Sequence, residues 1–187
     1  RLMLVASSND AAAALSQDLD NITFVQKMND FAHGLGLNSF LFKNETGLDN
    51  ETETEAGDLG SAHDVAYLFR YFLSNFSYLL YPTRYDHLTI SSSSGQRHTV
   101  ANTNAVVNQI TNLIGSKTGF TDLAGGNLVF AFQSNIIGSH SNIHRLTSRV
   151  GDPIIVAIIG STQDGRFSDA LALVKAANRY LSAKFSE

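Results

Sequence analysis

Three consecutive residues, Lys117, Thr118 and Gly119, are suited to holding a carboxylate beside an extended peptide. Lysine supplies a positive charge, and threonine supplies a hydroxyl that donates or accepts a hydrogen bond. Glycine leaves the backbone bare, so that a ligand backbone can approach closely. Because an apolar run follows over 128–132, we expect the triplet to begin a strand. Three common residues alone remain a weak signal for a binding site.

A second polar set, Ser7 and Asn9, forms a Ser-x-Asn triplet close to the start of the chain. It stands directly before the helix-forming run 11–14, and Asn9 and Asp10 give an N-cap signal there. Helix capping is the ordinary role of such a triplet. From the residues alone, a capping role and a catalytic role both stay open.

The composition is that of one globular domain. The chain has 187 residues, 43% of them hydrophobic, and a net charge of −4, which gives no reason to expect nucleic acid as a partner. Cysteine is absent, which excludes disulfides, thiolate catalysis and cysteine metal sites. His140 and His144 stand four residues apart, but in a polar stretch without a carboxylate pattern. We therefore expect no metal and no cofactor.

Periodicity and turn residues predict helices first and strands later. Apolar spacing indicates helices over 21–35 and 167–181. A further helix is predicted after Ser61, which would be its N-cap. The predicted extended elements are a segment at 40–42, a hairpin over 85–100, and strands through Lys117, over 128–132 and over 154–159. The strand over 154–159 is predicted to be fully buried. The predicted loops are 44–60, 102–113, which would include a short helix, and 134–151.

This order predicts a single α/β (α+β) domain over 1–187, in which an antiparallel sheet is covered by helices. Residues from about 1 to 82 would form a mostly helical subdomain, and residues from about 83 to 187 the sheet and the C-terminal helix. The chain opens directly in an apolar run over 1–6, without a cap or a polar leader. We take this start as the middle of a helix or core segment, and expect the domain to be incomplete at its N-terminus.

The motifs together resemble a known family. Ser7-x-Asn9 and Lys117-Thr118-Gly119 match two of the three motifs shared by penicillin-binding proteins and serine β-lactamases. The flanking residues are similar to those of D-alanyl-D-alanine carboxypeptidases, the low-molecular-weight penicillin-binding proteins. Similar stretches follow in order along the chain: 7–12, 28–29, 35–37, 47–49, 61–64, 117–121, 124–125, 127–129, 158–160 and 164–170.

The resemblance implies a β-lactamase/DD-peptidase-like fold and acyl transfer through a covalent serine ester. By resemblance, Ser7 would relay protons and Asn9 would hold the acylated substrate's amide. Lys117 would supply positive potential next to the reacting groups.

The resemblance also implies substrate-binding residues on the strand that carries the triplet. Thr118 would bond the terminal carboxylate, Gly119 would leave room for the substrate backbone, and the Phe120 backbone N–H would form half of an oxyanion hole. Arg166 would bind the terminal D-alanine carboxylate. A surface arginine at a helix start is the alternative for Arg166.

The family's first motif, Ser-x-x-Lys, is missing from these residues. None of the five lysines has a serine three positions before it. We therefore expect the nucleophile helix and the first strands to lie outside this chain, and the chain alone to be inactive. Open sheet edges would then favour aggregation, swapping, or pairing with the missing N-terminal segment as a companion chain.

The expected function, when complete, is removal of the terminal D-alanine from peptidoglycan stem peptides, with β-lactams as acylating ligands. The alternatives are a serine β-lactamase, for which the stretch 51–55 is the only candidate source of a deacylating glutamate, and a non-catalytic module that binds cell-wall peptides or β-lactams. We expect a bacterial protein in the periplasm or another extracytoplasmic location, with any membrane anchor in segments outside this chain.

Overall fold

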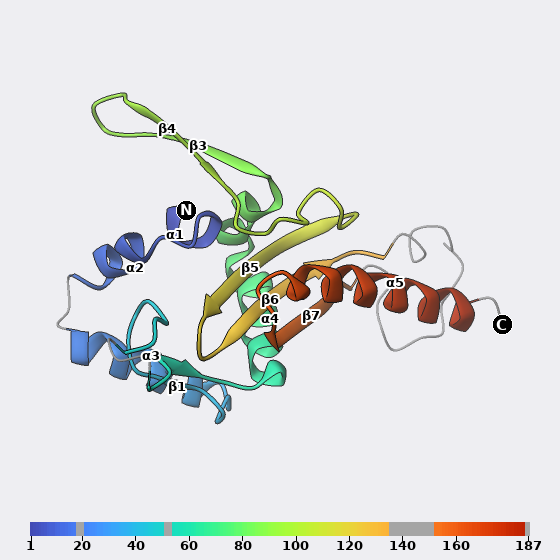
Figure 1. The fold of residues 1–187 in the computed structure, drawn as a ribbon, viewed down its shortest axis with the longest axis horizontal. Coiled ribbons are helices and arrows are strands. Elements are labelled where there is room, and N and C mark those ends of the chain that lie inside the picture. Colours follow the sequence, from blue (N-terminus) through green and yellow to red (C-terminus); the bar gives the residue numbers. More distant parts are fainter. Residues whose placement is uncertain (18–20, 51–53, 135–151, 186–187) are drawn as a thin grey trace.

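The computed structural model describes residues 1–17, 21–50, 54–134 and 152–185 (Figure 1). The N-terminal elements are α1 (Leu2–Val5), α2 (Asn9–Ser16), α3 (Asn21–Gly34), β1 (Leu41–Phe42), β2 (Asp58–Leu59), α4 (Ala62–Leu80) and the short 3-10 helix η1 (Tyr81–Arg84). The remaining elements are β3 (His87–Ser91), β4 (Arg97–Ala101), β5 (Leu113–Thr121), β6 (Gly125–Phe132), β7 (Ile154–Ser161) and α5 (Gly165–Phe185).

A three-stranded antiparallel sheet, in the order β5-β6-β7, forms the centre of the molecule. Lys117 and Thr118 lie in β5, opposite Val129 and Leu128 of β6. The triplet lies in the second half of β5 and not at the start of a strand as predicted, because β5 already begins at Leu113. The predicted strand through Lys117 and the predicted strand over 128–132 are neighbours. The predicted hairpin over 85–100 is formed by β3 and β4, and it extends away from the central sheet (Figure 1).

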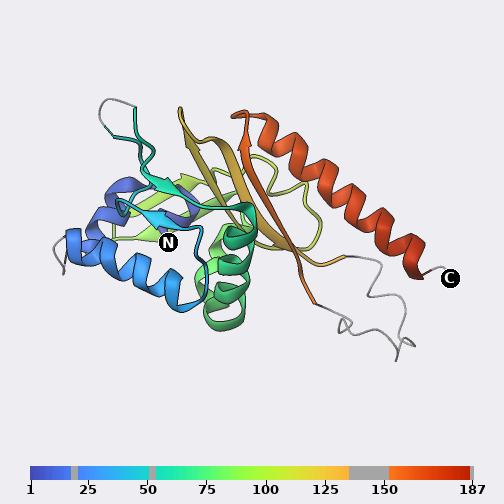
Figure 2. The ribbon, with the colours of Figure 1, turned by 90° about the horizontal axis from the view of Figure 1, so that it is seen from below.

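Helices cover both faces of this sheet (Figure 2). Side chains alternate along a strand, so Leu128, Phe130 and Phe132 of β6 pack in the cluster that includes Ala170 of α5. Ala131 faces the other way and packs with residues of α4, such as Phe69. The strand next to β5 is thus anchored from both sides, which fixes the backbone of the Lys-Thr-Gly triplet.

The predicted helices occur, with one correction at a helix start. Ser61 caps α4, because its side chain accepts a hydrogen bond from the Asp64 N–H at 3.2 Å. The predicted cap at Asn9 or Asp10 is wrong: Ser8 caps α2 by accepting from Ala11 N–H at 3.2 Å, and Asn9 is the first helical residue. Three successive polar residues all have cap-forming side chains, so their pattern could not select one.

Three further expectations from sequence differ from the structure. Strand β7 is half-buried rather than fully buried, and Ile159 is 45% exposed, because β7 pairs only with β6 among the described strands and lies at the sheet edge. The predicted loop over 44–60 contains the short strand β2, which pairs with β1. The segment 102–112 forms turns without the predicted short helix.

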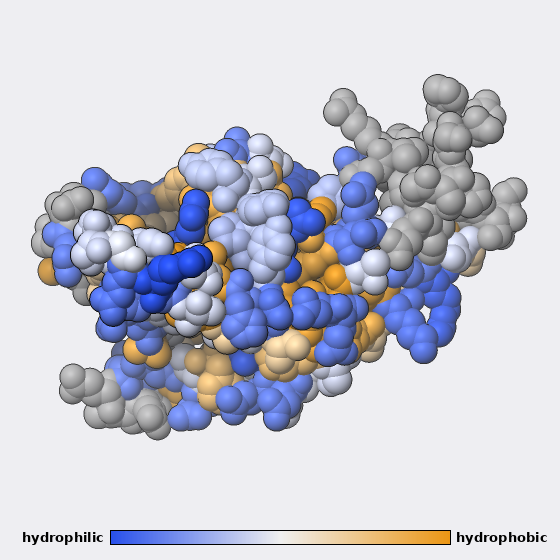
Figure 3. Space-filling view, turned by 90° about the horizontal axis from the view of Figure 1, so that it is seen from above, coloured by the Kyte–Doolittle hydropathy of each residue, from blue (hydrophilic) through white to orange (hydrophobic). Residues whose placement is uncertain are grey.

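Apolar side chains reach the surface of the molecule as well as its core. In Figure 3 they show as orange areas between hydrophilic residues in the middle of the face seen from above. No helix in the described part of the chain is long and apolar enough to cross a membrane. The same residues contain no group of three or more histidine, aspartate or glutamate side chains arranged to hold a metal ion. His140 and His144, with the rest of the predicted loop over 134–151 beyond Ser134, lie outside the described residues.

A buried carboxylate fastens the start of α4 to the preceding loop. Asp64 accepts hydrogen bonds from the Ser39 hydroxyl at 2.7 Å, the Ser39 N–H at 3.0 Å and His63 Nδ1 at 2.9 Å. These bonds, led by that of the Ser39 hydroxyl, lower the pKa of Asp64 to about 2. His63 thus has a structural contact near the start of its helix and is not part of the cleft described below.

We expect Asp64 to make stability depend on pH. Its pKa is lower in the folded chain than the ordinary 3.8, so its contribution is present above the ordinary value and is lost as the pH falls toward about 2. Asp64→Asn should flatten this part of the curve in urea unfolding measured from neutral to acid pH. An unchanged acid dependence in Asp64→Asn would assign the loss of stability to other carboxylates.

Candidate active site

The predicted site residues gather around one cleft of about 340 Å³. The junction between α1 and α2 forms one side, and β5 forms the other. Part of the loop between β1 and β2 contributes a third side. The lining residues are Ser7 and Asn9, Thr46 to Leu48, Thr103, Lys117 to Thr121, and Arg166. Every site residue predicted from the sequence is in this set.

Lys117 and Ser7 are the central contact of the cleft. The Lys117 Nζ donates to Ser7 Oγ at 2.7 Å and also to the carbonyl of Thr118. Burial, and secondarily the charge of Arg166, lower the pKa of Lys117 to about 8 from the ordinary 10.5. A lysine with such a pKa can exchange a proton with a neighbouring hydroxyl near neutral pH.

Ser7 has an unusual backbone conformation, with φ at +52°. This left-handed region is uncommon for residues other than glycine and costs free energy, so the surrounding structure must hold it. The next residue, Ser8, is the N-cap of α2, so the left-handed residue lies directly before the helix start. The conformation turns the chain between α1 and α2, and places Ser7 Oγ against Lys117 while Asn9 lies exposed at the rim.

Thr118 meets a residue that the sequence analysis did not single out. The Oγ1 atoms of Thr118 and Thr103 lie 2.6 Å apart. Thr103 also donates its backbone N–H to the carbonyl of Val5 at 3.0 Å. The signal available in the sequence is the polar triplet 102–104 before β5, which by itself indicates only a loop.

Arg166 is buried, 7% exposed, at the start of α5. Its Nη1 donates to the Gly119 carbonyl at 2.5 Å, and its guanidinium lies 4.7 Å from the ring centroid of Phe167 and 6.0 Å from that of Phe120. Burial lowers the pKa of Arg166, although the charge of Asp164 opposes this. Its Nε is buried without a hydrogen-bond partner among the described residues. The surface-arginine alternative is therefore wrong.

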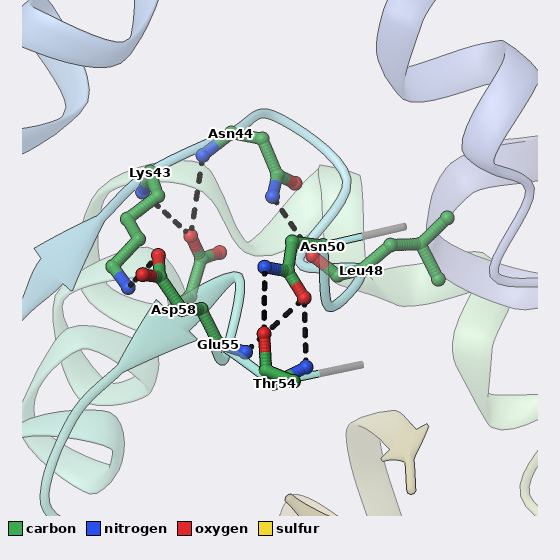
Figure 4. Close-up of polar contacts among 7 residues, drawn as sticks. All are labelled: Lys43, Asn44, Leu48, Asn50, Thr54, Glu55 and Asp58. Atoms are coloured by element: carbon green, nitrogen blue, oxygen red, sulfur yellow. Dashed lines mark hydrogen bonds and ion pairs between the residues drawn. The ribbon is translucent and has the colours of Figure 1, made fainter. Parts of the chain in front are cut away.

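The loop between β1 and β2 is held by side-chain bonds to its own backbone, several of them drawn in Figure 4. The Asn44 amide oxygen accepts from the N–H groups of Thr46 and Gly47 at 3.0 and 2.7 Å, while its Nδ2 donates to the Leu48 carbonyl at 2.9 Å. At the base of the loop, the Asp58 carboxylate accepts from the Lys43 N–H at 2.9 Å. These bonds fix the third side of the cleft.

A further bond joins this loop to the turn between β5 and β6. The Asp49 carboxylate accepts from the Leu123 N–H at 3.1 Å. The candidate glutamate of the β-lactamase alternative is not in the cleft: Glu55 is exposed and pairs with Lys43 at 3.7 Å (Figure 4). The other glutamates of that stretch lie outside the described residues.

The chain has an antiparallel sheet between helices, and a half-buried lysine on the edge strand β5 is hydrogen-bonded to Ser7. Its fold is that of penicillin-binding proteins and DD-peptidases. Solved structures of that class have the same fold: penicillin-binding protein D2 from Listeria monocytogenes, bound to ampicillin, superposes with a TM-score of 0.71 at 28% identity, over 92% of this chain and 64% of that chain. The chain belongs to the D-alanyl-D-alanine carboxypeptidase family, peptidase S11, whose pattern it matches over residues 1–138.

Two curated relatives share this family. The D-alanyl-D-alanine carboxypeptidase DacF of Bacillus subtilis is 33% identical over 119 residues, which cover 63% of this chain and 29% of that protein. The D-alanyl-D-alanine endopeptidase of Haemophilus influenzae is 33% identical over 135 residues, 70% of this chain and 43% of that protein. The chain thus spans less than half the length of either curated relative.

Proposed function

We propose that this chain forms part of a serine-type D-alanyl-D-alanine carboxypeptidase. The whole enzyme would remove the terminal D-alanine from peptidoglycan stem peptides through an acyl-enzyme, and penicillins would acylate it. The observation that carries the proposal is the hydrogen bond of 2.7 Å between Lys117 and Ser7 in the cleft, in a chain of this family.

In the proposed reaction, a serine of a Ser-x-x-Lys segment attacks the carbonyl of the penultimate D-alanine. The lysine of that segment takes the serine proton, and Ser7 passes a proton to the leaving amine of the terminal D-alanine. Asn9 holds the amide of the acylated part. Lys117 keeps the Ser7 hydroxyl oriented and favours the negative charge that develops in the transition state. Water then hydrolyses the ester.

The terminal carboxylate would lie along β5 in this proposal. Thr118 donates its hydroxyl to the carboxylate, and the positive charges of Lys117 and Arg166 attract it. Gly119 leaves room for the substrate backbone, and the Phe120 N–H points to the developing oxyanion. Arg166 also holds the Gly119 carbonyl, so its side chain supports the strand as well as the substrate.

The Ser-x-x-Lys segment is proposed to come from outside these 187 residues, on the same polypeptide or on a companion chain. An apolar groove of about 280 Å³ supports this. Side chains of α1 and α4 line it, together with Phe40, Val129 and Lys117. Because Lys117 borders both groove and cleft, a helix with an apolar face could lie in the groove and carry its serine to Ser7. The open edge of β7 would accept added strands.

We also propose an extracytoplasmic location, since peptidoglycan stem peptides lie outside the cytoplasmic membrane. Any membrane anchor would belong to segments outside this chain. Fractionation of the source cells, with detection of this chain, checks the location, and recovery in the cytoplasm alone would contradict it.

Labelling with a fluorescent penicillin tests the proposal. We expect no covalent adduct on the isolated chain, because Ser-x-x-Lys is absent from its sequence. We expect a labelled band on a denaturing gel when the upstream segment from the source gene is supplied, and no band when the serine of that segment is changed to alanine. If the supplemented protein binds penicillin without a covalent bond, the non-catalytic binding module becomes the better description.

A further inference from the structure

Thr103 connects the two opposite sides of the cleft. Its N–H donates to the Val5 carbonyl at 3.0 Å, two residues before Ser7. Its Oγ1 lies 2.6 Å from Thr118 Oγ1 on β5 and 3.3 Å from the same Val5 carbonyl oxygen. Among the described residues that line the cleft, Thr103 is therefore in direct contact with the backbone of one side and the carboxylate-binding hydroxyl of the other.

Two hydroxyls that share one hydrogen bond cannot both donate in it. If Thr103 donates to the Val5 carbonyl, Thr118 must donate to Thr103, and no hydrogen remains on Thr118 for a ligand. If Thr103 donates to Thr118, the hydrogen of Thr118 is free to bond an anion. The separation of 2.6 Å between the two oxygens suits a strong bond, whereas 3.3 Å to Val5 exceeds the usual hydroxyl distance.

The Val5 carbonyl does not need the Thr103 hydroxyl, because it already accepts the Thr103 N–H. The second arrangement therefore leaves no buried acceptor unsatisfied. It also forms a chain of bonds from Thr103 to Thr118 to the carboxylate, in which each bond polarises the next. A neutral C-terminal amide, which carries no negative charge, would gain less from this chain than a carboxylate.

We infer that Thr103 is a positioning residue that fixes Thr118 as a hydrogen-bond donor, and so favours ligands with a free terminal carboxylate. This inference rests on the proposed function, in which Thr118 meets that carboxylate. Thr103 acts through Thr118 and needs no contact with the substrate.

Polar contacts of the residues on both sides of Thr103 hold its backbone independently of its hydroxyl. Asn102 Nδ2 donates to the carbonyls of Thr83 and Tyr85 at 3.0 and 2.9 Å. Asn104, 1% exposed, donates to Ser116 Oγ at 3.0 Å. Replacing only the hydroxyl of Thr103 should therefore leave the turn in place.

The test compares Thr103→Val, which keeps the shape and removes the hydroxyl, with the matched control Thr103→Ser, which keeps the hydroxyl. The 187-residue chain, supplied with its upstream segment in which the Ser-x-x-Lys serine is changed to alanine to prevent turnover, is titrated with N-acetyl-D-alanyl-D-alanine and with its C-terminal amide. Binding is followed by NMR at the amides of Thr118 and Gly119. We expect Thr103→Val to bind the carboxylate about fivefold to twentyfold more weakly, and Thr103→Ser within about twofold of the unchanged chain.

The amide ligand separates this role from a merely structural one. Its affinity should fall clearly less than that of the carboxylate in Thr103→Val, because a neutral carbonyl gains less from the Thr118 hydroxyl than a charged carboxylate does. In a Thr118→Val background, adding Thr103→Val should cause no further loss of carboxylate affinity.

Three results would overturn the inference: equal losses for both ligands, an unchanged carboxylate affinity in Thr103→Val, or no response of the cleft amides to the carboxylate in the unchanged chain. The proposed function is tested separately, by penicillin labelling. If the supplemented protein binds the carboxylate but is not labelled by penicillin, the proposed function is contradicted and the inference about Thr103 is not. Matching thermal unfolding of the variants shows that each protein compared is folded.

Discussion

We expect Lys117→Met to lower the rate of penicillin acylation by about 10²-fold to 10³-fold in the protein supplied with its Ser-x-x-Lys segment. Methionine keeps most of the apolar stem of Lys117 but removes the ammonium that donates to Ser7 Oγ at 2.7 Å. Without it, the Ser7 hydroxyl loses its orienting donor and the cleft loses a charge. Single-turnover labelling with fluorescent penicillin measures the rate.

Lys175→Met is the matched control, because Lys175 is exposed on α5 and lines no part of the cleft. Its labelling rate should stay within about twofold of the unchanged protein. If Lys117→Met labels as fast as Lys175→Met, Lys117 has no part in acylation.

The pH dependence of acylation is a second test of the role of Lys117. With a pKa of about 8, Lys117 loses its proton as the pH rises through that value, and acylation should decline there if the protonated form is required. Arg166→Gln removes a positive neighbour of Lys117, so the midpoint of this decline should move to higher pH, although burial still keeps the pKa of Lys117 below 10.5.

The same pKa makes the stability of the folded chain depend on pH. Because the unfolded chain holds the Lys117 proton more tightly, the free energy of unfolding should rise between about pH 8 and 10.5.

We expect Gly57→Ala to damage both stability and the cleft. A Cβ at Gly57 would stand 1.9 Å from the Leu48 carbonyl oxygen and 2.8 Å from Asn44 Nδ2. The Leu48 oxygen belongs to the backbone and accepts a hydrogen bond from the Asn44 amide, so the loop that contributes Thr46 to Leu48 to the cleft must shift. Urea unfolding should show a loss of about 1–3 kcal/mol, and the affinity for N-acetyl-D-alanyl-D-alanine should fall as well.

Gly34→Ala is the control for this substitution. A Cβ at Gly34, the last residue of α3, meets nothing within 4 Å. Alanine favours helix there, so stability should be unchanged or slightly higher. Equal unfolding curves for Gly57→Ala and the unchanged chain would show that the loop adapts without cost, contrary to the contact with Leu48.

The elements with a strong hydrophobic period could be predicted from the sequence, and those that depend on distant partners could not. Helices α3 and α4 follow from apolar spacing and from Ser61 as a cap. The burial of β7 could not be read from its apolar run, because burial depends on which strands lie beside it. The start of α2 was missed because the capping role among neighbouring polar residues is decided by geometry.

The candidate site also combines residues that the sequence could indicate with residues whose role depends on distant contacts. Ser7 and Lys117, 110 positions apart in the chain, were placed together through a family resemblance and not through any local pattern. Thr103 was missed because its role depends on a hydroxyl contact with Thr118 across a turn. The resemblance suggested a function for Arg166, but only the structure shows that the side chain is buried against Gly119. Motif matching thus identified residues that the fold brings together in one cleft, but it missed Thr103, which contacts one of them across a turn.

The left-handed backbone of Ser7 limits which residues evolution can place there. Threonine offers the same hydroxyl, yet its branched Cβ makes a φ of +52° a severe outlier. Glycine and asparagine accept that φ, yet neither carries a hydroxyl. Serine thus combines a hydroxyl with a backbone that can adopt this φ. Substitution by threonine would strain the turn, and substitution by glycine or asparagine would remove the hydroxyl that contacts Lys117.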